Sequence, residues 1–508
     1  MNLNWKMITN ILGLLLGLNG LFMLLGIPFS LYYGEGDFSA LLFSGLITIG
    51  VGATAFFLTR KRERMISKRD GYLIVTMGWL MMSASGTLPY ILSGVIPDFA
   101  SAFFETVSGY TTTGASVLTD IEAAPKGILF WRAVTHWIGG MGIIVLTIAI
   151  LPILGIGGMQ LFAAESPGPS TDKLHPRIQS TAKALWLIYV GMTVVETILL
   201  VFGGMSFYDA ICHSFATVST GGFSTKNASV AAFDSAYIQY VIIFFMFLSG
   251  VNFTLTYFGL QGKLKKVWAN EEFKTYLGLI IIATLVAAIT ICFNEGSFSE
   301  KAIRDALFQV VAVVTTTGFV TADFTTWSTF VTVMFFLLFF TGGSAGSTAG
   351  GVKLVRHVII AKNSFFEFKR LVHPNAIVPV RFNQKTVSTQ IVYNILAFFI
   401  IFLGVFVIGS FVMAAILQDV PMMTTDGIPI TELNSGEGGM MYRFSTAMGA
   451  SASCVGNIGP GLAGVGPLQN YAWIPAGGKI FLAFEMLIGR LELFTVLILF
   501  SPYFWRRT

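Results

Sequence analysis

Ten apolar runs of membrane-spanning length divide the chain of 508 residues, and they constrain its fold more than any other feature. A spanning helix needs about 20 predominantly apolar residues, because the hydrocarbon core of a bilayer is about 30 Å thick. Only 11% of the residues are charged, whereas soluble domains carry about 25%. We therefore expect an all-α integral membrane protein with ten transmembrane helices, near residues 8–32, 38–59, 71–95, 129–155, 181–204, 236–261, 274–294, 328–352, 389–417 and 477–502.

Lysine and arginine gather in links that lie on one side of a ten-span topology, namely 59–70, 262–274, 353–385 and the C-terminus. Since basic loops stay in the cytoplasm, both termini are expected there. The net charge of +5 is thus a topology signal, and no nucleic acid partner is expected. Acidic residues in the opposite loops would concentrate cations at an outer mouth, although a solvated loop surface explains any single one of them equally well.

Four segments between paired spans are too short or too polar to cross, near 98–113, 207–221, 303–317 and 441–455. Each is expected to run as a half-length helix and to end in a small, hydroxyl-rich glycine loop. Such backbone at membrane depth must line a cavity or be buried in protein. Counting back thirteen residues from the glycines predicts N-cap positions at Ser101, Asp209 and Asp305, while the fourth segment is more divergent.

Spans and short segments alternate as helix, pore loop and helix four times, after an extra N-terminal pair. Parallel repeats about an axis along the membrane normal would place four glycines around one centre. The expected units are an N-terminal two-helix domain and pore repeats 1 to 4, at 1–69, 70–160, 161–265, 266–370 and 371–508.

A ring of backbone carbonyls can replace the hydration shell of a cation, and glycine lets the backbone turn its carbonyls inward. The loops carry no ring of Asp or Glu, so a monovalent cation is favoured over a divalent ion or an anion. The alternative is that the small residues only permit tight helix packing.

These loops and four further motifs together resemble the TrkH-type subunits of the Trk/Ktr/HKT potassium transporters. The motifs are WIGGMGI at 137–143, ESPGP at 165–169, GGSAGSTAGG at 342–351 and MLIGRLE at 486–492. The resemblance covers essentially the whole chain, including the N-terminal helix pair. It implies a K⁺ filter with one glycine in each repeat, which selects potassium over sodium, and neighbouring carbonyls from the preceding residues. The implied filter residues are Thr113, Gly114, Gly221, Gly222, Thr317, Gly318, Val455 and Gly456.

A run of small residues breaks the expected span at 328–352, because ten residues of Gly, Ser, Ala and Thr make a poor helix. It is no Walker A loop, since Val352 follows the last glycine. The resemblance implies that this intramembrane loop gates the pore, with Arg490 against its carbonyls. The alternative for Arg490 is an ion pair with Glu485 or Glu492. The implied gate is Gly342, Gly343, Ser344, Ala345, Gly346, Ser347, Thr348, Ala349, Gly350, Gly351 and Arg490.

Potassium uptake across a bacterial cytoplasmic membrane is therefore the expected function, and no enzymatic activity is expected, because the chain has no cofactor fingerprint or nucleophile motif. The alternative is a secondary symporter that couples K⁺ to Na⁺ or H⁺, with Glu196 as a candidate coupling acid. A structural carboxyl is the competing interpretation of Glu196. The longest cytoplasmic link is too short to sense a nucleotide, so we expect this chain to bind none. The resemblance implies a homodimer in contact with membrane lipids, regulated by a TrkA-like ring of nucleotide-binding RCK domains.

Overall fold

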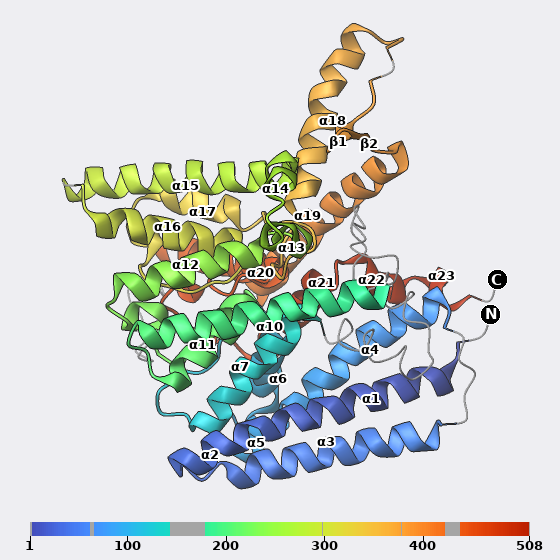
Figure 1. The fold of residues 1–508 in the computed structure, drawn as a ribbon, viewed down its shortest axis with the longest axis vertical. Helices are drawn as coiled ribbons and strands as arrows, with labels where there is room; N and C mark the ends of the chain where they lie inside the picture. Colours follow the sequence, from blue (N-terminus) through green and yellow to red (C-terminus); the bar gives the residue numbers. More distant parts are fainter. Residues whose placement is uncertain are drawn as a thin grey trace.

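The computed structural model is helical throughout and describes residues 3–60, 66–142, 178–296, 298–376, 378–421 and 437–506 (Figure 1). Within these residues the strands are limited to one antiparallel hairpin, β1 (Arg381–Phe382) and β2 (Lys385–Thr386). The 165–169 motif, and the boundary expected between the first two repeats at 160 and 161, lie outside the described residues.

The N-terminal helices form a closely packed antiparallel pair. The helix α1 (Trp5–Met23) continues through η1 (Leu24–Gly26) into α2 (Ile27–Tyr33) and packs along α3 (Phe38–Leu58). Glycines make this contact close: a Cβ atom at Gly13 would lie 2.7 Å from the carbonyl oxygen of Gly52, and one at Gly20 would lie 2.7 Å from that of Gly45. Such small-residue seams let helix backbones approach each other within a membrane.

The rest of the chain repeats a long helix, a helix that ends in a turn, and a broken helix. The first two sets are α4 (Lys68–Gly86) with α5 (Leu88–Leu92), α6 (Phe99–Tyr110) and α7 (Lys126–Met141), then α10 (Ile178–Phe202), α11 (Phe207–Val218), η2 (Ser229–Ala232), and α12 (Ala236–Gly250) with α13 (Phe253–Leu260).

The third and fourth sets follow the same order. They are α14 (Leu264–Ala269), α15 (Glu271–Glu295), α16 (Glu300–Val314), η3 (Phe324–Thr326), α17 (Thr329–Leu338) and α18 (Leu354–Val372), then α19 (Thr389–Leu417), α20 (Glu437–Gly456), η4 (Ala463–Val465), α21 (Ala476–Arg490), α22 (Phe494–Leu497), η5 (Ile498–Phe500) and α23 (Pro502–Trp505).

Five continuous helices in the described residues are long and apolar enough to cross a membrane, rather than the ten expected. The pair α12 and α13 would add a sixth, but it bends by 113°. The remaining expected spans contain breaks that shorten their helices, and the end of the 129–155 span lies outside the described residues. The five are Trp5–Tyr33, Phe38–Leu58, Lys183–Phe202, Glu271–Asn294 and Thr389–Leu417.

The helices that lead into the turns begin earlier than the sequence spacing predicts. Asp98 is the N-cap of α6 and accepts the backbone N–H of Ser101 at 2.9 Å. Likewise Ser206 caps α11 and accepts the N–H of Asp209 at 3.0 Å. The expected N-cap residues thus occupy the third helical position, where a backbone N–H needs the cap's oxygen. In the third repeat Ser299, not Asp305, is the cap.

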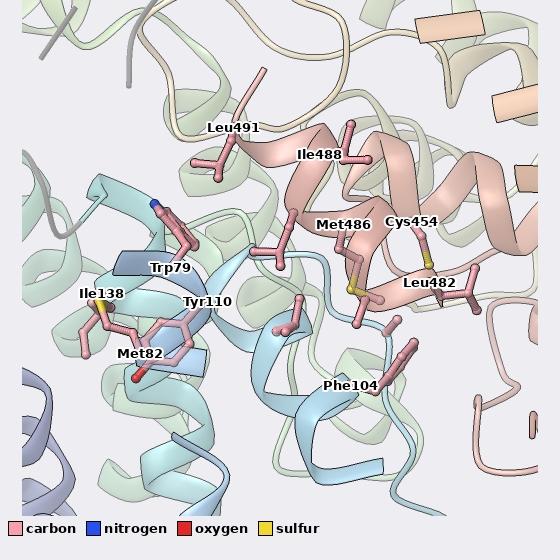
Figure 2. Packing of buried hydrophobic residues seen from close by; sticks show 14 of the residues in the cluster. Trp79, Met82, Phe104, Tyr110, Ile138, Cys454, Leu482, Met486, Ile488 and Leu491 are labelled. Carbon is pink, nitrogen blue, oxygen red and sulfur yellow. The ribbon is translucent and has the colours of Figure 1, made fainter. Parts of the chain in front are cut away.

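The first and fourth repeats share one buried hydrophobic cluster. Figure 2 shows Phe104 of α6 near Leu482 and Met486 of α21, with Cys454 of α20 beside these two. Because these residues come from opposite ends of the sequence, their packing fixes the beginning of the repeated region against its end.

Candidate functional site

Four turns with the same backbone conformation follow α6, α11, α16 and α20. In each, a residue other than glycine has a positive φ: 53° at Thr112, 56° at Thr220, 56° at Thr316 and 53° at Asn457. Three of these residues are β-branched, for which this left-handed conformation is a genuine outlier. Strain of this kind is of the order of 1–3 kcal/mol per residue and concentrates at functional sites.

Hydrogen bonds end the four helices in the same way. The backbone N–H one residue after each left-handed residue donates to the carbonyl five positions earlier, which is the Schellman pattern of helix termination. These bonds are Thr113 to Ser108 at 2.9 Å, Gly221 to Ala216 at 2.7 Å, Thr317 to Ala312 at 2.8 Å and Ile458 to Ser453 at 3.0 Å. We call residues 111–114, 219–222, 315–318 and 456–459 the four turns.

The last residue of every turn is a glycine with positive φ, and the four glycines pack in a cycle. A Cβ atom at Gly114 would overlap the carbonyl oxygen of Gly221, and one at Gly222 would overlap that of Thr317. The cycle continues from Gly318 to the carbonyl oxygen of Ile458, and it closes from Gly459 to that of Thr113, which a Cβ atom would approach to 2.6 Å. Only glycine fits these positions, so each repeat contacts the next one around a closed ring.

The fourth turn lies later in the chain than the sequence analysis predicts. Val455 and Gly456 lie at the end of the helix α20, and Gly456 does not have a positive φ. The residues equivalent to Thr113 and Gly114 are Ile458 and Gly459. The signal was present in the sequence, because Asn457-x-Gly459 matches the Thr-x-Gly of the other turns, and asparagine is enriched in the left-handed region.

Side-chain hydrogen bonds occur both within single turns and between two of the turns. The hydroxyls of Thr111 and Thr113 lie 2.7 Å apart, and those of Thr315 and Thr317 repeat this contact at 2.7 Å. The Asn457 amide nitrogen donates to Thr113 Oγ1 at 3.0 Å. The first and fourth turns are therefore joined by side chains as well as by backbone packing.

A buried ion pair supports the chain just after the first two turns. Arg132 of α7 donates to Glu105 of α6 at 2.7 Å, and both side chains are almost fully buried. Glu105 also accepts the N–H of Val117 at 2.7 Å, while Arg132 donates to the carbonyl of Ser224 at 2.9 Å and lies over the Phe223 ring. This ion pair was not predicted from the sequence, because its two charges are 27 residues apart.

His136 of α7 forms a second brace. Its Nδ1 donates to the carbonyl of Gly109 at 2.6 Å, and its Nε2 accepts the N–H of Phe223 at 3.1 Å. The ring stacks on Phe223 with centroids 4.0 Å apart. The neutral imidazole thus ties the end of α6 to the segment that follows the second turn.

The small-residue run 342–351 replaces helix between α17 and α18 and lies against the turns. Ser344 donates its N–H to the carbonyl of Gly250 at 2.8 Å, where α12 ends, and Thr348 Oγ1 donates to the carbonyl of Val218 at 3.0 Å. The N–H of Gly350 donates to Thr316 Oγ1 at 2.6 Å. We refer to this run as the intramembrane loop.

Glu272 of α15 bonds both to the intramembrane loop and to the start of α18, which follows the loop. Its Oε1 accepts the N–H of Ala345 at 2.7 Å and the N–H of Val355, at the start of α18, at 3.1 Å. The adjacent Glu271 forms an ion pair with Lys362 of α18 instead. The contact of Glu272 with the loop was not predicted from the sequence, because nothing in the local spacing around Glu272 points to a loop some 70 residues away.

Arg490, the last residue of α21, lies between the loop and the end of α7. Its guanidinium donates to the carbonyl of Thr348 at 2.8 Å and to that of Gly139 at 2.8 Å. The acids considered as its partners have other contacts: Glu492 forms an ion pair with Arg356, and Glu485 accepts the Ser451 hydroxyl at 3.0 Å. The loop carbonyl and the arginine are thus brought together as expected.

Comparison with known proteins gives consistent matches over the whole chain. The family profile described as "TrkH: Cation transport protein" matches residues 39–425. The "Trk system potassium uptake protein TrkH" of Escherichia coli (strain K12) is 38% identical over 99% of this chain and 100% of that protein. The "Trk system potassium uptake protein TrkG" of the same strain is 34% identical over 99% of each.

A solved structure agrees with these sequence matches. The crystal structure of the potassium transporter TrkH from Vibrio parahaemolyticus superimposes with a TM-score of 0.84 at 34% identity, covering 99% of this chain and all of the other. With the family profile matching well over half of the residues, the chain belongs to the TrkH family of cation transport proteins.

Proposed function

We propose that this protein takes up potassium across the bacterial cytoplasmic membrane through one pore at the centre of four repeats. The closed cycle of glycines and carbonyls, Gly114 to Gly221, Gly222 to Thr317, Gly318 to Ile458 and Gly459 to Thr113, carries the proposal. In this account ten helices span the membrane, five of which are continuous in the described residues. The repeat units are those expected from the sequence, at 70–160, 161–265, 266–370 and 371–508.

The proposed filter consists of Thr113, Gly114, Gly221, Gly222, Thr317, Gly318, Ile458 and Gly459. Carbonyl oxygens replace water around a dehydrated K⁺, and the helices α6, α11, α16 and α20 each direct a C-terminal partial charge of about −0.5 at the ring. The four turns contain no acidic side chain. This field is sufficient for a monovalent cation and weak for a divalent one.

The intramembrane loop and Arg490 form the proposed gate. The loop lies next to the turns through Thr316 and crosses to α11 through Thr348. A guanidinium beside the conduction path is an electrostatic barrier to cations, and its bonds to Thr348 and Gly139 brace the loop. Opening requires the loop to leave these contacts.

Two contacts with other subunits are proposed: one with a second protomer, and one with a separate cytoplasmic subunit that regulates the pore. Figure 1 shows α18 and the β1–β2 hairpin projecting from the helical body. On α18 the side chains of Phe365, Phe368 and Val372 lie on one face and are at least 70% exposed. An apolar face on a projecting helix supports contact with a second protomer in a homodimer. A TrkA-like subunit with RCK domains would bind the nucleotide, and this chain would bind none.

The alternative is a symporter that couples K⁺ entry to Na⁺ or H⁺. One observation favours keeping it as a candidate: both carboxyl oxygens of Glu196 on α10 are buried beside Thr217 of α11 and have no hydrogen-bond partner among the described residues. A carboxyl in such a place exchanges a proton only if the path to it opens.

Rubidium flux into liposomes tests the proposal, with the unaltered protein compared with Gly114→Ser. A channel-like protein gives currents whose reversal potential follows potassium alone, and Gly114→Ser lowers the preference for rubidium over sodium. An unchanged preference in the variant would contradict the filter assignment. Strict dependence of flux on a sodium or proton gradient, abolished by Glu196→Gln, would instead support the symporter.

A further inference from the structure

The left-handed residues of the four turns differ in what their side chains contact. Thr112 Oγ1 is buried and has no hydrogen-bond partner in the part of the chain that the structure describes. Thr220 Oγ1 donates to the carbonyl of Ser219 at 2.6 Å, within its own turn. Thr316 Oγ1 instead accepts the Gly350 N–H of the intramembrane loop at 2.6 Å. Equivalent backbone positions therefore have non-equivalent partners.

Gly350 is enclosed by the third and fourth turns. A Cβ atom there would lie 2.8 Å from Asn457 Cβ, 2.9 Å from the carbonyl oxygen of Gly456 and 3.3 Å from Thr316 Oγ1. The loop therefore contacts the ring at a point with no room for a side chain. Its bond to Thr316 is short and buried, since Thr316 has no exposed surface.

The other loop contacts reach elements further from the ring. Ser344 and Thr348 bond to the ends of α12 and α11, Ala345 bonds to Glu272 of α15, and Arg490 bonds to Thr348. In the described part of the chain, Thr316 is the left-handed turn residue whose side chain bonds to the loop.

We propose that the Thr316 hydroxyl is the latch by which the filter holds the intramembrane loop closed, so that gate and filter are coupled at this one turn. When the loop withdraws, Thr316 Oγ1 loses its donor and resembles Thr112. The docked loop directs the partial positive charge of the Gly350 N–H toward the third turn. A cation bound at this turn therefore weakens the docking of the loop, and the docked loop weakens the binding of the cation to the same extent.

The inference rests on the proposed function, because it assumes that the loop obstructs the pore. Its test uses three single substitutions in the full-length protein in liposomes without a regulatory subunit. Thr316→Val keeps the shape and the β-branch but removes the acceptor. Thr316→Ser keeps the hydroxyl. Thr112→Val makes the same change at the equivalent residue of the first turn, where no bond to the loop exists.

Basal rubidium flux is the readout. Thr316→Val is expected to raise it about two- to tenfold, the range for losing one neutral hydrogen bond. Thr316→Ser, which keeps the acceptor, and Thr112→Val, which has no bond to the loop to lose, should each raise it less than Thr316→Val does. A merely structural role would not separate the two valine variants, since both positions have the same strained backbone.

Two results would overturn the latch: flux in Thr316→Val equal to that of the unaltered protein, or an equal rise in Thr112→Val. If Thr316→Val does not purify as a monodisperse protein, Thr316→Ala decides the question by the same flux measurement. Failure of the filter assignment is recognised separately, as a rubidium-over-sodium preference that Gly114→Ser leaves unchanged, whereas the latch is judged on the amount of flux.

Discussion

The side-chain amide of Asn457 donates to Thr113 Oγ1 at 3.0 Å, although 344 residues separate the two in sequence. The same nitrogen donates to the carbonyl of Met486 in α21 at 2.9 Å. One side chain therefore joins the first turn, the fourth turn and the helix that ends at Arg490. The least regular repeat is the one that closes the ring.

Replacing Asn457 should loosen this closure. Asn457→Ala removes both donated bonds and leaves the carbonyl of Met486 without this donor, which is expected to cost about 1–3 kcal/mol for the buried group. Thermal unfolding in detergent measures the loss. Asn470→Ala is the control, because in the described residues Asn470 accepts the N–H of Ala472 within its own loop. Equal unfolding temperatures for the two variants would contradict the role given to Asn457.

Removing the guanidinium of Arg490 should open the pore without its regulator. Arg490→Ala loses the charge-assisted bonds to Thr348 and Gly139 together with the positive charge, so basal rubidium flux is expected to rise about tenfold or more. Arg370→Ala is the control, since Arg370 pairs with Glu367 on the surface of α18. The gate assignment fails if flux stays at the basal level in Arg490→Ala.

Glu272 should matter for gating in a way that its neighbour does not. Glu272→Ala frees Ala345 of the intramembrane loop and Val355 at the start of α18, so basal flux is expected to rise severalfold. Glu271→Ala breaks only the half-exposed pair with Lys362, and pairs of this kind contribute about 0–1 kcal/mol. An equal rise of basal flux in both variants would show that the bonds of Glu272 to Ala345 and Val355 do not control the flux.

The Glu105–Arg132 pair should be required for folding. Glu105→Ala leaves the Arg132 charge buried, and breaking one side of a buried pair typically costs about 3–5 kcal/mol. The surface pair Lys226–Glu122 lies nearby and supplies the control Glu122→Ala, for which a change near zero is expected. Detergent unfolding curves compare the two, and a stability loss no greater in Glu105→Ala than in Glu122→Ala would contradict this brace.

Much of the fold could be predicted from the apolar runs and the glycine loops. The order of helices and the loop at 342–351 follow from features that are local in sequence, whereas the contact of Arg490 with the loop was expected from the family resemblance. Three of the four turns were also predicted in the correct register, because Thr-x-Gly ends a helix in each of them.

The remainder depended on contacts that no local pattern encodes. The fourth turn was placed at Gly456 because a glycine follows the small-residue segment there, whereas Asn457 takes the left-handed position and Gly459 meets Thr113. Glu272 bonds to backbone some 70 residues further along the chain, and Glu105 pairs with Arg132, 27 residues away. The helix starts were predicted too late, because Ser101, Asp209 and Asp305 are residue types that cap helices but lie inside α6, α11 and α16.

The most direct test of the account is the rubidium-over-sodium permeability ratio of Gly459→Ser in liposomes. A side chain at Gly459 meets the carbonyl oxygen of Thr113 and disturbs the ring where the first and fourth repeats join. Gly278→Ser on α15 is the matched control, since a Cβ atom there meets nothing within 4 Å. The account predicts a lowered ratio in Gly459→Ser and an unchanged ratio in Gly278→Ser. An unchanged ratio in Gly459→Ser would contradict the claim that this ring selects the ion.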